Sequence, residues 1–316
     1  MRSLHIVLVP VVLLVLILVS ACANAPALAT PATVPITGSE ATSAAPIATE
    51  PSLEAVSGSE IFEDLEDFDP SNFDNPTDID NHWFPLKPGT QWIYEGVTEE
   101  SGLSIPHRVI FTVTDLTKVI AGVRTVVVWD QDYSAGVLEE TELAFFAQDN
   151  DGNVWHLGQY PEEYEEGKLV VAPAWITGLK GATAGISMKA EPQLGTPSYS
   201  QGWGPAVNWT DRAQVSEIGQ QTCIPFGCYE DVIVIEEFNR EEPDAFQLKY
   251  YAPGVGNVRV GWKGLDATRE RLELIDLVDL SPEDLAQARA AVLELEKRAY
   301  TNSKEVYGQT PPLEGR

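Results

Sequence analysis

The segment LAFFAQDNDGNVWHL, residues 143–157, decides the fold, because it shows two apolar runs joined by a short polar turn. The runs are 143–147 and 154–157, and Asp151 and Gly152 stand between them. An Asp-Gly pair favours a tight reversal of the chain, since glycine adopts positive φ without strain. The segment therefore predicts a β-hairpin. A calcium site at this turn would need about six to eight oxygen ligands, more than the short loop contains.

Similar short runs, bounded by Gly, Pro, Asp and Asn, continue on both sides of the hairpin. Val109, Phe111 and Val113 occupy every second position and so share one face of a strand. Residues 81–280 therefore predict a mainly β domain, an antiparallel sheet in an open barrel or a sandwich-like arrangement. The predicted strands are 91–97, 109–114, 123–129, 143–147, 154–157, 207–218, 229–238, 247–251, 258–262 and 271–277.

Residues 281–316, after the last strand, predict a C-terminal helix and tail. Ser281 is a favourable cap, Pro282 suits the first turn, and the acidic residues that follow stabilise the positive end of the helix dipole. Apolar residues then recur at steps of three and four, which makes one stripe along the helix. We expect the stripe to dock on the sheet or beside it; its members are Leu285, Ala288, Val292, Leu295 and Ala299.

The amino terminus carries an export signal. Arg2 precedes an apolar run, and the run ends in Val-Ser-Ala before Cys22, a pattern typical of a cleaved signal peptide over residues 1–21. The Val-Ser-Ala-Cys ending resembles the lipobox of bacterial lipoproteins, which implies that Cys22 is the first mature residue and carries acyl chains such as palmitate. We expect a lipid-anchored protein of the cell membrane or cell envelope that faces outside the cytoplasm. An uncut transmembrane anchor is the alternative, but the run is shorter than the roughly 18 to 20 residues that a spanning helix needs.

Residues 22–80 predict a disordered tether, rich in Ala, Pro and Thr at first and acidic later. The first part has too few large apolar side chains to offset the entropy of ordering. In the acidic part, Ser57 and Glu60 have the spacing of a capping box, and Pro70 would end a helix. This pattern predicts a short acidic helix that docks on the protein's own domain or on a partner; plain disorder is the alternative.

The chain is strongly acidic, with a formal net charge of -28 and a pI near 4.3. This charge excludes nucleic acid as a partner, because phosphates would be repelled. Cys223 and Cys228 are the cysteines left beside Cys22. They flank a turn that contains Pro225 and Gly227, so we expect a disulfide at the base of a hairpin. A metal site would need two further thiol or imidazole ligands, and the sequence shows none at ligand spacing.

Residues 172–206 are the least regular part of the domain and contain many glycines. Long irregular loops often carry function. Trp175, Trp203 and Trp209 are the candidate ligand contacts, since their ring faces suit sugar rings or lipid chains. The alternative is that these aromatic residues belong to the core or its rim.

Catalytic motifs are not found: there is no nucleophile elbow, no Ser-x-x-Lys, no zinc-binding His-Glu-x-x-His and no phosphate loop. The adjacent acids Glu162-Glu163, Glu165-Glu166 and Glu236-Glu237 could act on a glycoside. In so acidic a chain we expect them on the solvated surface instead. The sequence implies no catalytic residue, no metal and no cofactor.

Four motifs together resemble a group of uncharacterised bacterial secreted proteins and lipoproteins: PLKPG (85–89) with WIY (92–94), AQDNDGNVW (147–155), PFGCYEDV (225–232) and KYYAPGVG (249–256). Their residues form turns and strands, so the resemblance implies a shared antiparallel β scaffold and no known activity. The domain is also loosely similar to the open half-barrels of periplasmic lipoprotein carriers.

These observations predict a non-catalytic binding or envelope-associated module that meets a lipid, glycan or protein ligand. Two other classes stay open. One is a hydrolase that acts on cell-surface glycans or peptides, and the other is a structural scaffold that binds partner proteins.

Overall fold

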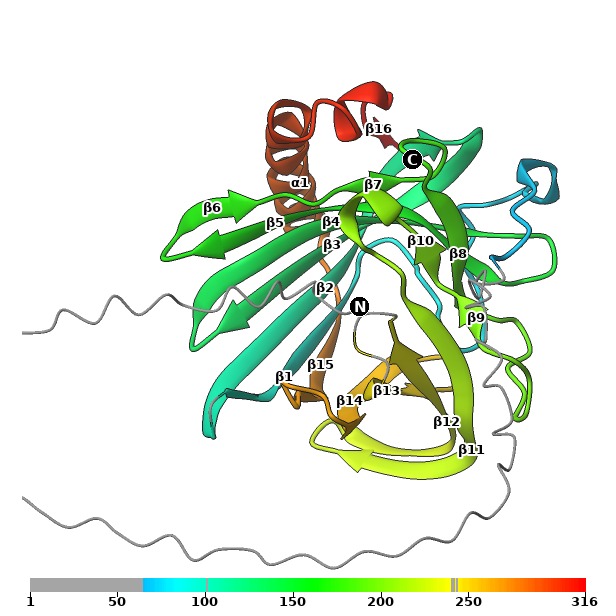
Figure 1. The fold of residues 1–316 in the computed structure, drawn as a ribbon, viewed down its shortest axis with the longest axis vertical. Helices are drawn as coiled ribbons and strands as arrows, with labels where there is room; N and C mark the ends of the chain where they lie inside the picture. Colours follow the sequence, from blue (N-terminus) through cyan, green and yellow to red (C-terminus); the bar gives the residue numbers. More distant parts are fainter. Residues whose placement is uncertain (1–64, 101, 240–241, 243) are drawn as a thin grey trace, which may run out of the picture. The chain divides into compact units, whose positions relative to one another are not determined.

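The computed structural model describes residues 65–316 except 101, 240–241 and 243. The predicted signal, Cys22 and most of the predicted tether lie outside the described residues. The described part forms one antiparallel sheet and one long helix (Figure 1), which confirms the predicted fold class. The strands are β1 (Thr90–Glu100), β2 (Leu103–Ile120), β3 (Val123–Ser134), β4 (Val137–Gln148), β5 (Val154–Glu165), β6 (Lys168–Val171), β7 (Trp175–Ile176), β8 (Thr183–Met188), β9 (Tyr199–Ser200), β10 (Gly202–Trp203), β11 (Arg212–Ile224), β12 (Gly227–Phe238), β13 (Ala245–Ala252), β14 (Gly256–Gly264), β15 (Arg271–Asp279) and β16 (Glu314–Gly315).

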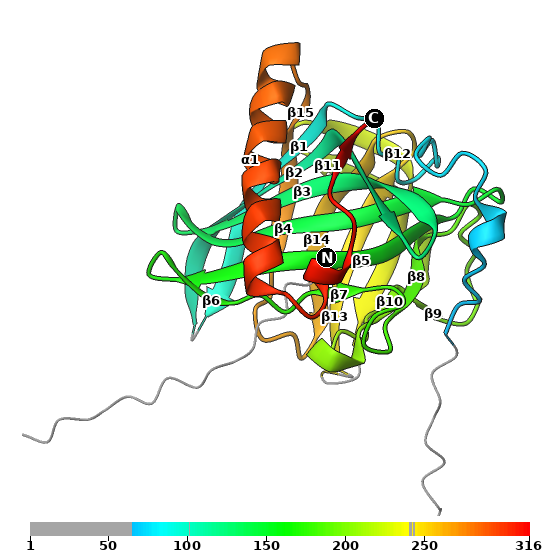
Figure 2. The same cartoon turned by 90° about the horizontal axis from the view of Figure 1, so that it is seen from above.

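Neighbouring strands follow the order β10-β8-β5-β4-β3-β2-β1-β15-β14-β13-β12-β11-β9. Most neighbours are joined by hairpins, and the pairing of β1 with β15 connects the two halves. The first wing is defined here as β1–β5 with β8, and the second wing as β11–β15. The sheet curls so that the wings face each other (Figures 1 and 2), and their facing sides are called the inner face. The strands at the two ends of the path, β10 and β9, do not pair with each other, so the sheet is open.

The hairpin predicted from residues 143–157 is the turn between β4 and β5. The Asp149 carboxylate accepts hydrogen bonds from the backbone amides of Asp151 and Asn153, and from the indole N–H of Trp155. Gly152 has a φ of 86°, which explains the glycine at this position. The carboxylate of Asp149 is therefore used within the turn.

Part of the apolar core fills one end of the inner face, and the rest lies under α1. Phe84, just before β1, packs its ring against Phe111 of β2, Phe146 of β4 and Tyr251 of β13. Leu86 is 1% exposed beside them. The segment that leads into β1 thus closes this end of the sheet, and polar side chains on the inner face are left to the opposite end.

Helix α1 (Pro282–Asn302) covers the outer face of the first wing (Figure 2). The Ser281 side chain caps the helix, as predicted, by accepting a hydrogen bond from the Asp284 amide. Ala288, Val292, Leu295 and Ala299 are buried, so the predicted stripe docks on the sheet. Among the described residues, no helix has the length and apolar character needed to cross a membrane.

One of the two expectations about irregular segments needs correction. Residues 65–69, the described part of the predicted acidic helix, are not helical, and a single 3-10 turn at Pro70–Asn72 follows them. Phe68 and Phe73 pack on Trp155 instead, because aromatic burial does not require helical backbone. The segment 172–206 is the least regular part of the domain, as expected: it contributes the short strands β7 to β10 to the sheet, and most of its other residues lie in turns and loops.

The predicted disulfide is formed. Cys223 on β11 and Cys228 on β12 stand directly opposite each other at the end of their hairpin, with Cα atoms 4.0 Å apart. The turn between them holds Pro225 and the half-exposed Phe226.

Candidate functional site

The first wing carries a group of carboxylates on its inner face. On β3, Asp130 and Asp132 lie opposite Glu142 and Glu140 of β4, and Glu163 of β5 lies opposite Glu140. Paired residues point to the same side of a sheet, and so do residues two apart on one strand. The five carboxyl groups therefore share one patch, which we call the inner acidic patch.

The pKa values of three members of this patch, Asp130, Glu140 and Glu142, are raised because their negative charges are poorly compensated. Burial, together with repulsion from Asp132, raises the pKa of Asp130 to about 7. Burial and repulsion from Asp130 raise the pKa of Glu142 to about 8. The pKa of Glu140 also lies well above its usual range, because of burial and then the charge of Glu142. At neutral pH the patch holds protons that ordinary carboxyl groups would release.

Lys249 and Glu237 face this patch from the second wing. The Lys249 Nζ lies 2.6 Å from the Glu237 carboxylate, and Gln201 donates a hydrogen bond of 2.8 Å to the same group. Burial opposes ionisation of Glu237, but the charge of Lys249 outweighs it and lowers the pKa of Glu237 to about 2. Lys249 also lowers the pKa of Asp130 and Glu142. The two wings are thus in electrostatic contact across the inner face.

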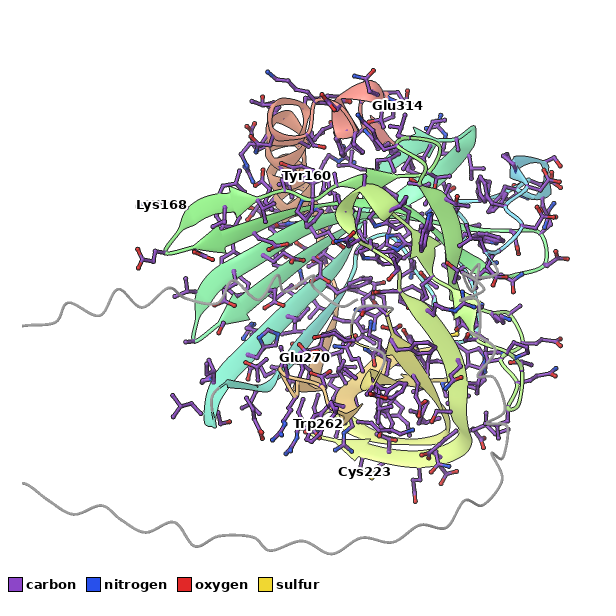
Figure 3. All side chains as sticks on the ribbon, viewed as in Figure 1. Tyr160, Lys168, Cys223, Trp262, Glu270 and Glu314 are labelled. Atoms are coloured by element: carbon purple, nitrogen blue, oxygen red, sulfur yellow. A yellow bond between two sulfur atoms is a disulfide. The ribbon has the colours of Figure 1, made fainter. Side chains whose placement is uncertain are left out.

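His107 on β2 joins the inner acidic patch to the second half of the sheet. Its Nε2 lies 3.3 Å from Asp132 and 2.9 Å from Glu270, which precedes β15 and is labelled in Figure 3. Burial would lower the pKa of His107, but the two nearby carboxylates raise it to about 10. His107 is therefore a cation at neutral pH, held between two acids.

Buried oxygen atoms without partners border the patch. Gln159 on β5 is 5% exposed, and its side-chain oxygen accepts no hydrogen bond. It lies opposite Ala144, one step along the inner face from Glu142. One oxygen of Glu142, which is 3% exposed, and the side-chain oxygen of Gln247, 6% exposed on β13, also lack partners. Buried polar atoms are normally hydrogen-bonded, so this set of acceptors is short of donors.

Two of the three predicted tryptophans lie in the core. Trp175 is 2% exposed and Trp209 is 4% exposed, and their ring centroids are 4.8 Å apart. His156 packs edge-on against both rings. A Cβ at Gly202 would lie 2.6 Å from the Trp175 ring, so this glycine permits the packing. Trp203 is half-buried. The structure therefore brings Trp175 and Trp209 together in the core, and neither presents a free ring face.

The expectation that the paired acids are solvated is wrong for two of the three pairs. Glu162 is 0% exposed, Glu236 is 5% exposed and Glu237 is 3% exposed. Because successive strand residues point to opposite sides, each pair is divided between the two faces. Glu163 and Glu237 face inward, whereas Glu162 and Glu236 face outward and have their own partners. Neither pair can therefore act jointly on one glycosidic bond.

Sequence reasoning did not identify the inner acidic patch. Its acids stand two apart in Asp130-Gln-Asp132 and Glu140-Thr-Glu142, and this spacing was the available signal. Among the described residues, no group of three or more His, Cys, Asp or Glu side chains is arranged to hold a metal ion.

No protein-family model matches the chain, and no curated protein sequence matches it. Two solved structures are similar. One is a protein from Bacteroides fragilis, described as exported and as having a YmcC-like fold. It is 13% identical to this chain with a TM-score of 0.37, and the match covers 63% of this chain and 99% of the Bacteroides chain. The other is described as a lipoprotein from Parabacteroides distasonis, with 13% identity, a TM-score of 0.30 and the same coverage. At these scores and identities, neither likeness assigns a function to this chain.

Proposed function

We propose that the chain is an exported, lipid-anchored protein of the cell envelope that binds a ligand at the polar end of its inner face, without catalysis. The signal-like residues 1–21 and the lipobox-like ending at Cys22 support the anchor. The disulfide between Cys223 and Cys228 fits an oxidising compartment outside the cytoplasm.

The unpaired oxygens of Gln159, Glu142 and Gln247 carry the binding proposal. Each buried polar atom left without a partner costs about 1–3 kcal/mol. A fold that keeps several of them on one surface loses stability unless another molecule supplies donors. A ligand that donates hydrogen bonds to these oxygens would offset this cost.

A hydrolase is the second candidate, and one observation favours it. Carboxyl groups with pKa values of about 7 and about 8, as at Asp130 and Glu142, can act as general acids near neutral pH. Turnover of a glycan or peptide that disappears in the Glu142→Gln variant would support this candidate over simple binding.

Native mass spectrometry tests the proposal. The mature chain from residue 22, carrying Cys22→Ser, is exported, purified without detergent and sprayed from a neutral volatile buffer. We expect a reproducible extra mass on the wild-type chain, lost or reduced in Gln159→Met. Gln214→Met, on the outer side of β11 where the amide bonds Glu236, is the matched control and should keep the mass. A bare chain in every preparation, with no ligand found by screening, would contradict the proposal.

A further inference from the structure

We propose that the ligand is an organic cation, bound through an ammonium or guanidinium group against the inner acidic patch. This inference rests on the proposed binding function and names the chemistry of its ligand. It follows from three properties of the patch: its excess of acids, its excess of hydrogen-bond acceptors, and the spacing of both.

Acids outnumber bases on this part of the inner face. Lys249 is engaged by Glu237, and His107 is engaged by Asp132 and Glu270. Within the described residues, no ion pair joins a cationic side chain to Asp130, Glu140 or Glu142. A positive charge placed among these three groups would therefore meet acids that have no cation of their own.

The neutral amide groups beside the acids also favour a ligand that donates hydrogen bonds. The side-chain oxygens of Gln159 and Gln247 are buried acceptors without donors. An ammonium group has three N–H donors and a guanidinium group has five, and neither has an acceptor. A ligand of this kind supplies what both the carboxylates and the amide oxygens lack, whereas an anionic or acceptor-rich ligand would add to the imbalance.

The acceptors are also spread out. Asp130, Glu142 and Gln159 come from three adjacent strands, β3, β4 and β5. Neighbouring strands lie about 4.8 Å apart, and residues on one face of a strand are about 6–7 Å apart. The patch therefore matches a ligand whose donors are spread over several ångströms, such as a polyamine or a short peptide with lysine side chains.

Isothermal titration of the mature chain (Cys22→Ser) at about 0.15 M salt tests the inference, with spermidine and trilysine as separate probes. Binding of spermidine alone identifies free polyamines as the source of the cation, and binding of trilysine alone identifies peptide side chains. Binding of both also supports the inference. Succinate and maltose serve as anionic and neutral probes, and we expect no heat from either.

At about pH 8.5, where the Glu142 carboxyl group is mostly ionised, the variant Glu142→Gln should weaken binding of the cationic probe by about tenfold or more, since a charged hydrogen-bond partner is lost. Gln159→Met is the second site variant and should also weaken it. Glu95→Gln is the matched control, because Glu95 is exposed on the outer side of β1 and pairs with Arg108. Binding to the wild type should tighten between about pH 6 and pH 8.5, as the patch releases its protons.

Equal weakening in Glu142→Gln and Glu95→Gln would overturn the inference, since it would mean that the probe only follows the net charge of the protein. A copurified ligand that is neutral or anionic, with no binding of either amine, would overturn the inference and leave the proposed function intact. Absence of both a copurified ligand and any amine binding would overturn the inference and the proposed function together.

Discussion

Single buried carboxyl groups differ in how much they reduce the stability of this fold. Glu142 is 3% exposed, one of its oxygens has no partner, and burial raises the pKa of its carboxyl group to about 8. In contrast, Asp149 is 6% exposed but satisfied by four hydrogen bonds within its turn. Burial of a carboxylate alone is therefore not unusual, since its oxygens can be satisfied locally; a buried carboxylate oxygen without a partner is the exception that needs an explanation.

Glu142 gives a prediction about the pH dependence of stability. Between its ordinary pKa near 4.5 and about 8, Glu142 keeps its proton in the folded state and loses it in the unfolded state. The folded state then binds more protons, so the contribution of Glu142 to stability falls as pH rises through this window. We expect Glu142→Gln to resemble the wild type near pH 4.5 and to be more stable than it near pH 8.

Urea unfolding at several pH values measures this difference, with Glu95→Gln as the exposed control. The control should show no such pH-dependent gain. A difference between Glu142→Gln and the wild type that stays constant with pH would contradict the prediction.

At the scale of elements, helix α1 is held to the sheet by polar anchors as well as by its apolar stripe. Glu162 on β5 accepts hydrogen bonds from Tyr160, Tyr164, Arg298 and Asn302. Tyr160 is labelled in Figure 3 on the side of the sheet that α1 covers. Farther along, the buried Lys118 of β2 pairs with Glu296 of the helix at 3.4 Å. The bonds that Arg298, Asn302 and Glu296 of the helix make with the sheet each join residues that are more than a hundred positions apart.

Glu162→Ala tests the anchor on β5. The substitution leaves Tyr160, Asn302 and the half-exposed Arg298 without their common acceptor, so we expect a loss of about 2–3 kcal/mol in the free energy of unfolding. Glu165→Ala, an exposed site on the same strand, is the control and should change it by less than about 0.5 kcal/mol. Chemical denaturation followed by tryptophan fluorescence measures both, and equal effects would refute the role of Glu162 as an anchor.

For the whole molecule, the structured part begins earlier than the boundary at residue 81 that composition indicated. Ile79 is 4% exposed in the main core, and Phe68 and Phe73 pack on Trp155. The amide of Gln148 also donates to the carbonyl of Pro76. These contacts connect the acidic segment to the β4–β5 turn.

Truncation tests this boundary. A chain that begins at residue 81 loses Ile79 and both phenylalanines, so we expect it to be less stable than the mature chain by about 3 kcal/mol or more. A chain that begins at residue 65 keeps these contacts and is the matched control. Urea midpoints compare the three chains, and equal midpoints would show that the segment adds nothing to the fold.

The sequence by itself determined the elements whose signals are local. The β4–β5 turn follows from Asp151 and Gly152, the start of α1 follows from Ser281 and Pro282, and the disulfide follows from two cysteines around a tight turn. Most of the strands fall where alternation predicted them, because the side-chain period of two is a property of neighbouring residues.

Only the tertiary structure decided which face of each strand is inside. Alternation places Glu142 and Leu143 on opposite faces but does not say which face α1 covers, and both faces of this wing are buried. Bulges near Asp132 and Phe145 also shift the pairing register locally. The register of the β3–β4 and β4–β5 hairpins therefore gathered Asp130, Glu142 and Gln159 on one surface, and the curl of the sheet made that surface an inner face. The same long-range packing placed Trp175 and Trp209 in the core.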